Sequence, residues 1–179
     1  MGLQEYNHSD LEKQYNIEII DNYVSNVDDI LEEVYASPEY IFKDRGDQNA
    51  LYKYKTLDNR GGTLHTMMYH SFSDKLKELC IETVDFGKYS KPTEIAINRY
   101  RPGGYLGKHR DSVGGYWKFQ LIFLKSSKSH FTWYDKEDNP HLIQEAPGRG
   151  VELPAHIVHE STEIGADEED KYSMVFVWR

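Results

Sequence analysis

The 179-residue chain has little cysteine, no long apolar run and fewer basic than acidic residues. Its one cysteine, Cys80, excludes an internal disulfide and a cysteine-rich zinc site. No stretch approaches the roughly 20 apolar residues that a membrane-spanning helix needs. The polar N-terminal segment MGLQEYNHSDLEKQY lacks the apolar core of a signal peptide. These absences predict a protein without a membrane partner, in the cytoplasm or another reducing compartment inside the cell.

The charge balance bears on the partners that the protein can have. The chain has 30 acidic and 21 basic residues, which give a formal net charge of −9. Nonspecific binding of nucleic acid depends on Lys and Arg neutralising phosphates, so this balance disfavours it. Much of the acid lies in 28–33 and 167–170, whereas 43–60 is locally basic. A solvated hairpin or loop is the simpler explanation of that basic segment, and nucleic acid remains a disfavoured partner.

The length and the pattern of the chain predict one domain, over 1–179. In the first half, a short strand is expected over 17–24, and helices are expected over 27–37 and 74–84. In the second half, aromatic and β-branched segments alternate with Gly and Pro turns, which favours an antiparallel sandwich or barrel. We therefore predict a mostly β fold with flanking helices, in which a supporting part of 17–90 precedes a core of 94–179.

Turn residues separate the predicted strands of the second half. EIAINRY at 94–100 alternates apolar with polar residues, and WKFQLIFL at 117–124 is apolar enough to be buried. RPGGYLG at 101–107 is interpreted as a turn between them. The other predicted strands are HFTWYD at 130–135, HLIQEA at 141–146, GRGVELP at 148–154 and KYSMVFVWR at 171–179.

Histidine and aspartate form the most informative pattern of the chain. His109 and Asp111 have one residue between them, and on a strand such residues point to the same side. The glycine turn before them can bring the chain close to a buried site. His-x-Asp alone is a weak signal, and a metal site needs a third ligand from elsewhere. The candidates for that ligand are His130, His141, His156 and His159.

His159 is the preferred third ligand. His130 and His141 border a strand and its turn, where side chains are expected to face water. His159 follows a glycine-initiated strand and a proline, and His156 is interpreted as an exposed or supporting histidine. Two histidines and one carboxylate form the facial triad that is typical of non-haem Fe(II) oxygenases. That ligand set leaves metal positions open for a cosubstrate and O2.

Lys171 and Ser173 alternate along the terminal strand and so share one of its faces. A lone Lys that opens a strand is usually a surface charge. A Lys and a hydroxyl that both point into a barrel can instead bind a carboxylate.

The segments INRYRPGGYLGKHRD and KYSMVFVW, together with His159, resemble the Fe(II)- and 2-oxoglutarate-dependent dioxygenases. The resemblance extends from about Glu94 to the end of the chain. It implies a double-stranded β-helix, which is a cupin-like jelly roll, with Fe(II) held by His109, Asp111 and His159. It further implies that Lys171 binds the remote carboxylate of 2-oxoglutarate, with Ser173 as the accompanying hydroxyl. The implied reaction consumes O2, releases succinate and CO2 and hydroxylates a C–H bond, with ascorbate as a supporting reductant.

Two features of the resemblance favour different branches of the family. The run Asn-Arg-Tyr-x-Pro-Gly looks like the AlkB-type nucleic-acid dealkylases, in which the Asn and Tyr contact the cosubstrate; these roles fall on Asn98 and Tyr100. That branch carries arginines on the last core strand, where this chain has Lys171 and Val177. A lysine at the first of these positions is typical of the prolyl-hydroxylase-like branch.

The resemblance therefore implies a hydroxylase that acts on a polypeptide side chain or a small molecule. Oxidative dealkylation of nucleic acid is the alternative. A catalytically silent metal-binding jelly-roll module and a hydrolytic zinc enzyme with the same three ligands are remoter hypotheses.

Four residues are candidates for a substrate pocket: Tyr105, Arg60, Trp117 and Trp133. Plain core packing is the simpler explanation for at least half of the aromatic residues near the site. The segment 41–70 precedes the core where related enzymes carry substrate-covering loops. Its mixture of tyrosines, arginine and glycines is typical of a mobile lid.

Overall fold

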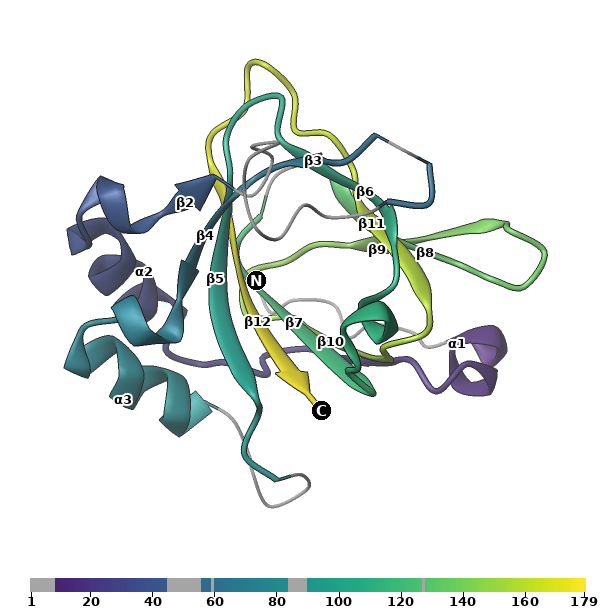
Figure 1. Ribbon diagram of the computed structural model, residues 1–179, viewed down its shortest axis with the longest axis horizontal. Helices are drawn as coiled ribbons and strands as arrows, with labels where there is room; N and C mark the ends of the chain where they lie inside the picture. The colour runs from purple at the N-terminus through teal and green to yellow at the C-terminus, as the bar shows by residue number, and fades with distance from the viewer. Residues whose placement is uncertain (1–8, 45–55, 59, 84–89, 127) are drawn as a thin grey trace.

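The computed structural model describes residues 9–44, 56–58, 60–83, 90–126 and 128–179, which form two antiparallel β-sheets and several helices (Figure 1). The larger sheet, called the major sheet, has seven strands in the spatial order β1, β10, β7, β12, β5, β4 and β2. Their bounds, in that order, are Glu18–Ile20, Gly150–Pro154, Lys118–Lys125, Lys171–Trp178, Glu94–Tyr100, His65–Met68 and Lys43–Asp44.

The smaller sheet, called the minor sheet, has five strands in the order β3, β6, β11, β8 and β9. Their bounds are Gly62–Thr63, Tyr105–His109, Val158–Ser161, His130–Tyr134 and Pro140–Gln144. The helices are α1 (Asp10–Gln14), α2 (Val27–Ala36) and α3 (Asp74–Thr83), and short 3-10 turns cover Glu39–Ile41, Tyr69–Ser71 and Asp111–Gly114. Within the described residues, none of the helices has the length and apolar character to span a membrane.

The alternation of side chains along β12 separates two parts of the core. Met174 and Phe176 belong to a hydrophobic cluster with Ile30 of α2 and Leu76 of α3, so the helices cover one face of the major sheet (Figure 1). Val177 belongs to a second cluster with Phe131 of β8, which lies on the minor sheet. Residues of β12 with the parity of Val177 therefore point into the space between the two sheets.

Most predicted elements are confirmed, but helix α1 and strands β2, β3, β4, β6 and β11 were not predicted. Helices form at 27–36 and 74–83, and the hydroxyl of Ser73 accepts a hydrogen bond from the Leu76 N–H at 3.0 Å, as an N-terminal cap does. Strand β4 lies within the segment 41–70 that was interpreted as a lid. Strand β11 was not predicted either, although it carries His159. Tyr105 opens strand β6 and does not lie in the preceding turn, which ends by residue 104.

The predicted lid, 41–70, is only partly within the described residues, because 45–55 and 59 lie outside them. Part of it, residues 56–58 and 60–63, called the strap, lies along β6. The Leu57 N–H donates to the Lys108 carbonyl at 2.6 Å, and the Gly107 N–H donates to the Gly61 carbonyl at 2.9 Å. Strand β3 within the strap pairs with the first residues of β6. The strap is therefore attached to the strand that carries His109.

Candidate functional site

His109, Asp111 and His159 come together at one place in the fold. His109 ends β6, His159 lies on the neighbouring strand β11, and the two are register partners with ring centroids 4.2 Å apart. Asp111 opens the 3-10 turn after β6 rather than lying on the strand. Its carboxylate oxygens lie 3.9 Å from His109 Nε2 and 3.4 Å from His159 Nε2. One ligand atom from each residue lies within 4.8 Å of the other two, so the three can reach one metal ion.

Backbone carbonyls orient both imidazoles. His109 Nδ1 lies 2.8 Å from the Gly107 carbonyl oxygen, and His159 Nδ1 lies 3.0 Å from that of Ile157. A carbonyl can only accept a hydrogen bond, so each Nδ1 carries the proton and donates it. Each Nε2 then keeps a lone pair for a metal, and the carbonyl contact fixes the direction of that lone pair.

Burial determines the charges of the three residues. Burial, together with the neighbouring His159, lowers the pKa of His109 to about 4. Burial likewise lowers the pKa of His159 to about 4, and it raises the pKa of the Asp111 carboxyl. Both imidazoles are therefore neutral near pH 7, which is the form that binds metals.

The three residues fit a divalent cation. Among the described residues, the buried atoms His159 Nε2 and Asp111 Oδ2 have no hydrogen-bond partner. Such orphaned atoms cost free energy, and a cation between them would satisfy both and would favour the charged carboxylate. A ligand set of two nitrogens and one oxygen is one that Fe(II) and Zn(II) both accept.

Aromatic rings enclose His159. Phe119 of β7 and Phe131 of β8 have ring centroids 5.1 and 5.4 Å from its imidazole, and each is tilted by 33° to it. Both phenylalanines are buried in the cluster between the sheets. The site is therefore lined on these sides by apolar groups, which strengthen electrostatic interactions within it.

Lys171, Ser173, Tyr100 and Asn98, the four residues predicted to bind a cosubstrate, lie together. Lys171 is the register partner of Tyr100, and Ser173 is that of Asn98, on the paired strands β12 and β5. All four are buried. Lys171 and Ser173 have the parity of Val177, and their register partners on β5 lie on the same side of the sheet, so all four point between the sheets. Lys171 Nζ lies 5.0 Å from the centroid of the Tyr100 ring.

Arg99 lies between Asn98 and Tyr100 but points to the opposite face of β5. Its guanidinium contacts Asp170 at 2.7 Å and Glu39 at 2.7 Å, and it lies 5.8 Å from the centroid of the Phe42 ring. Arg99 therefore fixes the helix-covered side of the major sheet rather than the inner face.

Glu145 is a residue of the inner face that the sequence patterns did not indicate. Its Oε1 accepts a hydrogen bond from Lys171 Nζ at 2.5 Å, and the two side chains are 0% and 1% exposed. Glu145 follows β9 with the parity of Ile143, which is fully buried in the cluster between the sheets. A charged residue two positions after the apolar, inward-facing Ile143 was the available signal.

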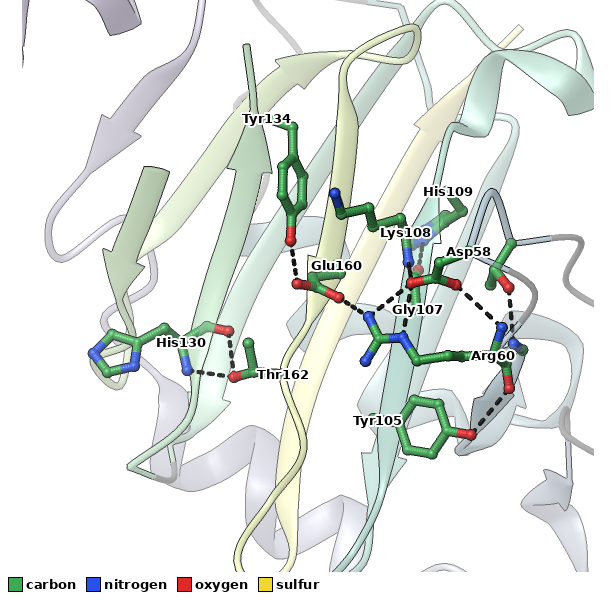
Figure 2. Close-up of polar contacts among 12 residues, drawn as sticks. Asp58, Arg60, Tyr105, Gly107, Lys108, His109, His130, Tyr134, Glu160 and Thr162 are labelled. Carbon is green, nitrogen blue, oxygen red and sulfur yellow. Dashed lines mark hydrogen bonds and ion pairs between the residues drawn. The ribbon is translucent and has the colours of Figure 1, made fainter. Parts of the chain in front are cut away.

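The predicted pocket residues lie in three different settings. Trp133 is 1% exposed and belongs to the cluster between the sheets, where it is the register partner of His159 and its ring stacks on that of His141 at 4.3 Å. Trp117 is 52% exposed and is on the surface. The Tyr105 hydroxyl donates to the Arg60 carbonyl at 3.0 Å, so these two residues contact each other (Figure 2).

Arg60 belongs to a polar network that holds the strap, and sequence reasoning missed this network (Figure 2). Its guanidinium donates to Asp58 at 2.8 Å and to Glu160, and Glu160 also accepts from the Tyr134 hydroxyl. Glu160 follows His159 on β11 and therefore points to the other face of the minor sheet. The network therefore packs on the face of the minor sheet opposite to His159.

Asp58 connects the strap to the metal site. Burial raises the pKa of its carboxyl, but hydrogen bonds from the Lys108 N–H and from Arg60 outweigh burial and lower that pKa to about 2. A Cβ at Gly107 would lie 2.7 Å from Asp58 Oδ1. Asp58 would therefore have to shift to admit a side chain at Gly107, and the carbonyl of Gly107 is the one that orients His109.

A cavity of about 310 Å³ lies beside the metal-site strands. Arg110 and Ile157, which are sequence neighbours of the metal-site residues, contribute to its lining, as does Tyr15 just after α1. Lys136 and His156 give the cavity further basic groups. His156, rejected as a metal ligand from the sequence, thus lines the cavity rather than the triad.

Comparisons with known proteins agree with this geometry at the level of the fold. No family model and no curated protein matches the sequence. Among solved structures, a prolyl-4-hydroxylase from Pseudomonas putida has a TM-score of 0.65 at 13% identity, over 95% of this chain and 96% of that one. A prolyl hydroxylase from Trichoplax adhaerens, in complex with a hypoxia inducible factor peptide, has a TM-score of 0.69 at 16% identity, over 93% and 85%.

A third similar structure is OsALKBH1, with a TM-score of 0.58 at 13% identity, over 91% of this chain and 97% of that one. At these identities the comparisons show a shared fold. The predicted double-stranded β-helix, or jelly roll, is confirmed, and it is the fold of these oxygenases.

Proposed function

We propose that this protein is an Fe(II)- and 2-oxoglutarate-dependent dioxygenase that hydroxylates a C–H bond of a polypeptide side chain or a small molecule. The observation that carries the proposal is the convergence of His109, Asp111 and His159, whose ligand atoms lie within 4.8 Å of one another. The shared fold and the buried Lys171 on the inner face support it.

The proposed metal site has its ligands aligned in advance. The Gly107 and Ile157 carbonyls hold the two imidazoles with Nε2 directed at the ion. Bound Fe(II) and 2-oxoglutarate would supply the oxidation, in which O2 converts the cosubstrate to succinate and CO2 while a substrate C–H becomes C–OH. Phe119 and Phe131 beside His159 keep water from that part of the site.

Lys171 is the proposed partner of the remote carboxylate of 2-oxoglutarate. Its ammonium is a point charge that does not fix the direction of a bound carboxylate by itself. The hydroxyls of Ser173 and Tyr100, on the same face of the paired strands, are the groups that would supply direction. Asn98 already accepts a hydrogen bond from the Thr66 hydroxyl at 2.8 Å, which holds its amide in place beside Ser173.

Val177 favours a hydroxylase over a nucleic-acid dealkylase. It stands where the dealkylase branch carries its second arginine, and here it is buried as the register partner of Phe119. That position supplies no second cation. For a peptide or metabolite substrate, the cavity beside the metal-site strands offers charged and polar groups of both signs, with Arg110 and Lys136 opposite in charge to Asp135.

Oxidative dealkylation of nucleic acid is the second candidate, because Asn98 and Tyr100 face inward beside Lys171 and because the fold is shared with OsALKBH1. Binding to single-stranded oligonucleotides at increasing salt distinguishes the two functions. A dealkylase would bind at low salt and lose affinity steeply as salt rises. We expect no measurable binding at low salt.

Succinate formation tests the proposed reaction. The purified protein should convert 2-oxoglutarate to succinate only when Fe(II) and O2 are present, and Asp111→Ala should abolish the conversion. Asp138→Asn is the control, because Asp138 is an exposed residue that pairs with Lys108. Succinate formation that survives Asp111→Ala would contradict the assignment of the metal site.

A substrate screen read by mass spectrometry tests the reaction class. Peptides and metabolites that are hydroxylated gain one oxygen atom, whereas demethylated nucleic acids lose one methylene unit. We expect a product of the first kind. A product of the second kind alone would establish the dealkylase instead.

A further inference from the structure

We propose that Glu145 is an internal carboxylate that competes with 2-oxoglutarate for Lys171 and so sets the affinity and selectivity for the cosubstrate. This inference rests on the proposed function. It concerns a residue that no motif of the chain singles out, and it follows from the contact that Lys171 makes in the structure.

The Glu145–Lys171 pair bridges the two sheets. Glu145 extends the inner face of β9 in the minor sheet, and Lys171 opens β12 in the major sheet. Their Oε1–Nζ distance is 2.5 Å, and both side chains are within 1% of full burial. The ammonium that should receive the remote carboxylate of a cosubstrate therefore already binds a carboxylate of the protein.

A third charge cannot simply be added to this pair. The pair is neutral, and a second carboxylate would place two negative charges beside one ammonium in an apolar interior. Like charges in such a place repel strongly, and burial penalises an uncompensated carboxylate. The cosubstrate carboxylate must therefore take the place of the Glu145 carboxylate on Lys171. The affinity for 2-oxoglutarate is then reduced by the strength of the internal pair.

The exchange is assigned to the side chain of Glu145, because the backbone before it is held in place. The guanidinium of Arg149 donates to the Gln144 carbonyl at 2.6 Å and to Asp21 at 2.6 Å, which anchors the backbone immediately before Glu145. Ser173 lies next to Lys171 on the inner face, so its hydroxyl is placed to meet the incoming carboxylate. The arrangement selects for a cosubstrate whose remote group is a carboxylate, because a neutral group cannot displace Glu145.

Calorimetric titration of 2-oxoglutarate into the oxygen-free protein loaded with Mn(II) tests this inference. Glu145→Gln removes the competing charge and should tighten 2-oxoglutarate binding by about tenfold or more. Glu145→Asp, whose shorter side chain reaches Lys171 less well, should tighten it by a smaller factor. Glu152→Gln is the matched control, because Glu152 forms another buried pair with a lysine, Lys118, at 2.9 Å.

A second ligand isolates the remote carboxylate. 2-Oxopentanoate has the same chain length as 2-oxoglutarate but ends in a methyl group, so its binding should not tighten in Glu145→Gln. Equal 2-oxoglutarate affinities in the wild type, Glu145→Gln and Glu145→Asp would overturn the role of Glu145, and so would weaker binding in the variants. A protein that binds Mn(II) but gives no 2-oxoglutarate binding in any variant would overturn the proposed function as well.

Discussion

His109 and His159 are register partners on neighbouring antiparallel strands, and each imidazole donates from Nδ1 to the carbonyl two residues before it. The two rings are thus oriented by the same kind of hydrogen bond, one on each strand. With Asp111 Oδ2 only 3.4 Å from His159 Nε2, the three residues form a compact ligand set. The site is therefore organised by the strands themselves, and the predictions below follow from that organisation.

His159→Ala should weaken Mn(II) binding by more than about 100-fold, because it removes a ligand whose loss costs more than that of a supporting contact. His156→Ala is the matched control, since His156 is only three residues away but is exposed and lines the neighbouring cavity. Calorimetric titration of Mn(II) measures both affinities. Equal losses in the two variants would contradict the assignment of His159.

Gly107→Ala should disturb both the strap and the metal site. Its Cβ would lie 2.7 Å from Asp58 Oδ1, and such an overlap costs about 1–3 kcal/mol of stability. Because the Gly107 carbonyl orients His109, Mn(II) binding should also weaken, by roughly tenfold. Urea unfolding and calorimetry measure the two effects. A fully stable variant with unchanged Mn(II) affinity would show that the strap and the site are independent.

The ionised carboxylate of Asp58 should stabilise the folded protein, and this contribution to the free energy of unfolding should be lost at acid pH. The pKa of Asp58 is about 2 in the folded protein, below its value of about 3.9 in an unfolded chain. The unfolded state therefore binds more protons between these values, and stability falls as the pH falls from about 4 toward 2. Asp58→Asn should lose up to about 2 kcal/mol at pH 7 and almost nothing relative to the wild type near pH 2. A difference in unfolding free energy that is the same at both pH values would contradict this origin.

Lys171→Met should destabilise the protein by about 3–5 kcal/mol, because it removes the ammonium partner of the buried Glu145. The double variant Lys171→Met with Glu145→Leu should regain most of that loss, since neither charge is then buried. Urea unfolding of the two single variants and the double variant gives the coupling energy. Additive losses would mean that the pair does not act as a unit.

The fold could be predicted from the sequence where each segment carries its own signal. The alternation in EIAINRY and the apolar run WKFQLIFL gave β5 and β7 nearly to their observed ends. Strand β11 was missed because VHES is four residues long and mostly polar, so it has no pattern of its own. It is a strand because it pairs on both sides, with β6 and with β8.

Part of the candidate site could be predicted from the spacing of residues along the chain. His109 and Asp111 are two residues apart, and Lys171 opens the last strand two residues before Ser173. Glu145 was missed because it meets Lys171 across the gap between two sheets, 26 residues away in the chain. The burial of Trp133 could not be predicted, because an aromatic residue of the core and one of a pocket look alike in a sequence. Only packing distinguishes them.

Turnover under heavy-isotope O2 tests the central claim most directly. If His109, Asp111 and His159 hold Fe(II) for 2-oxoglutarate oxidation, the wild-type protein should form succinate that contains one heavy oxygen atom from O2. The labelled succinate should require Fe(II) and should be absent from Asp111→Ala. Unlabelled succinate, or labelled succinate at an unchanged rate in Asp111→Ala, would contradict the account.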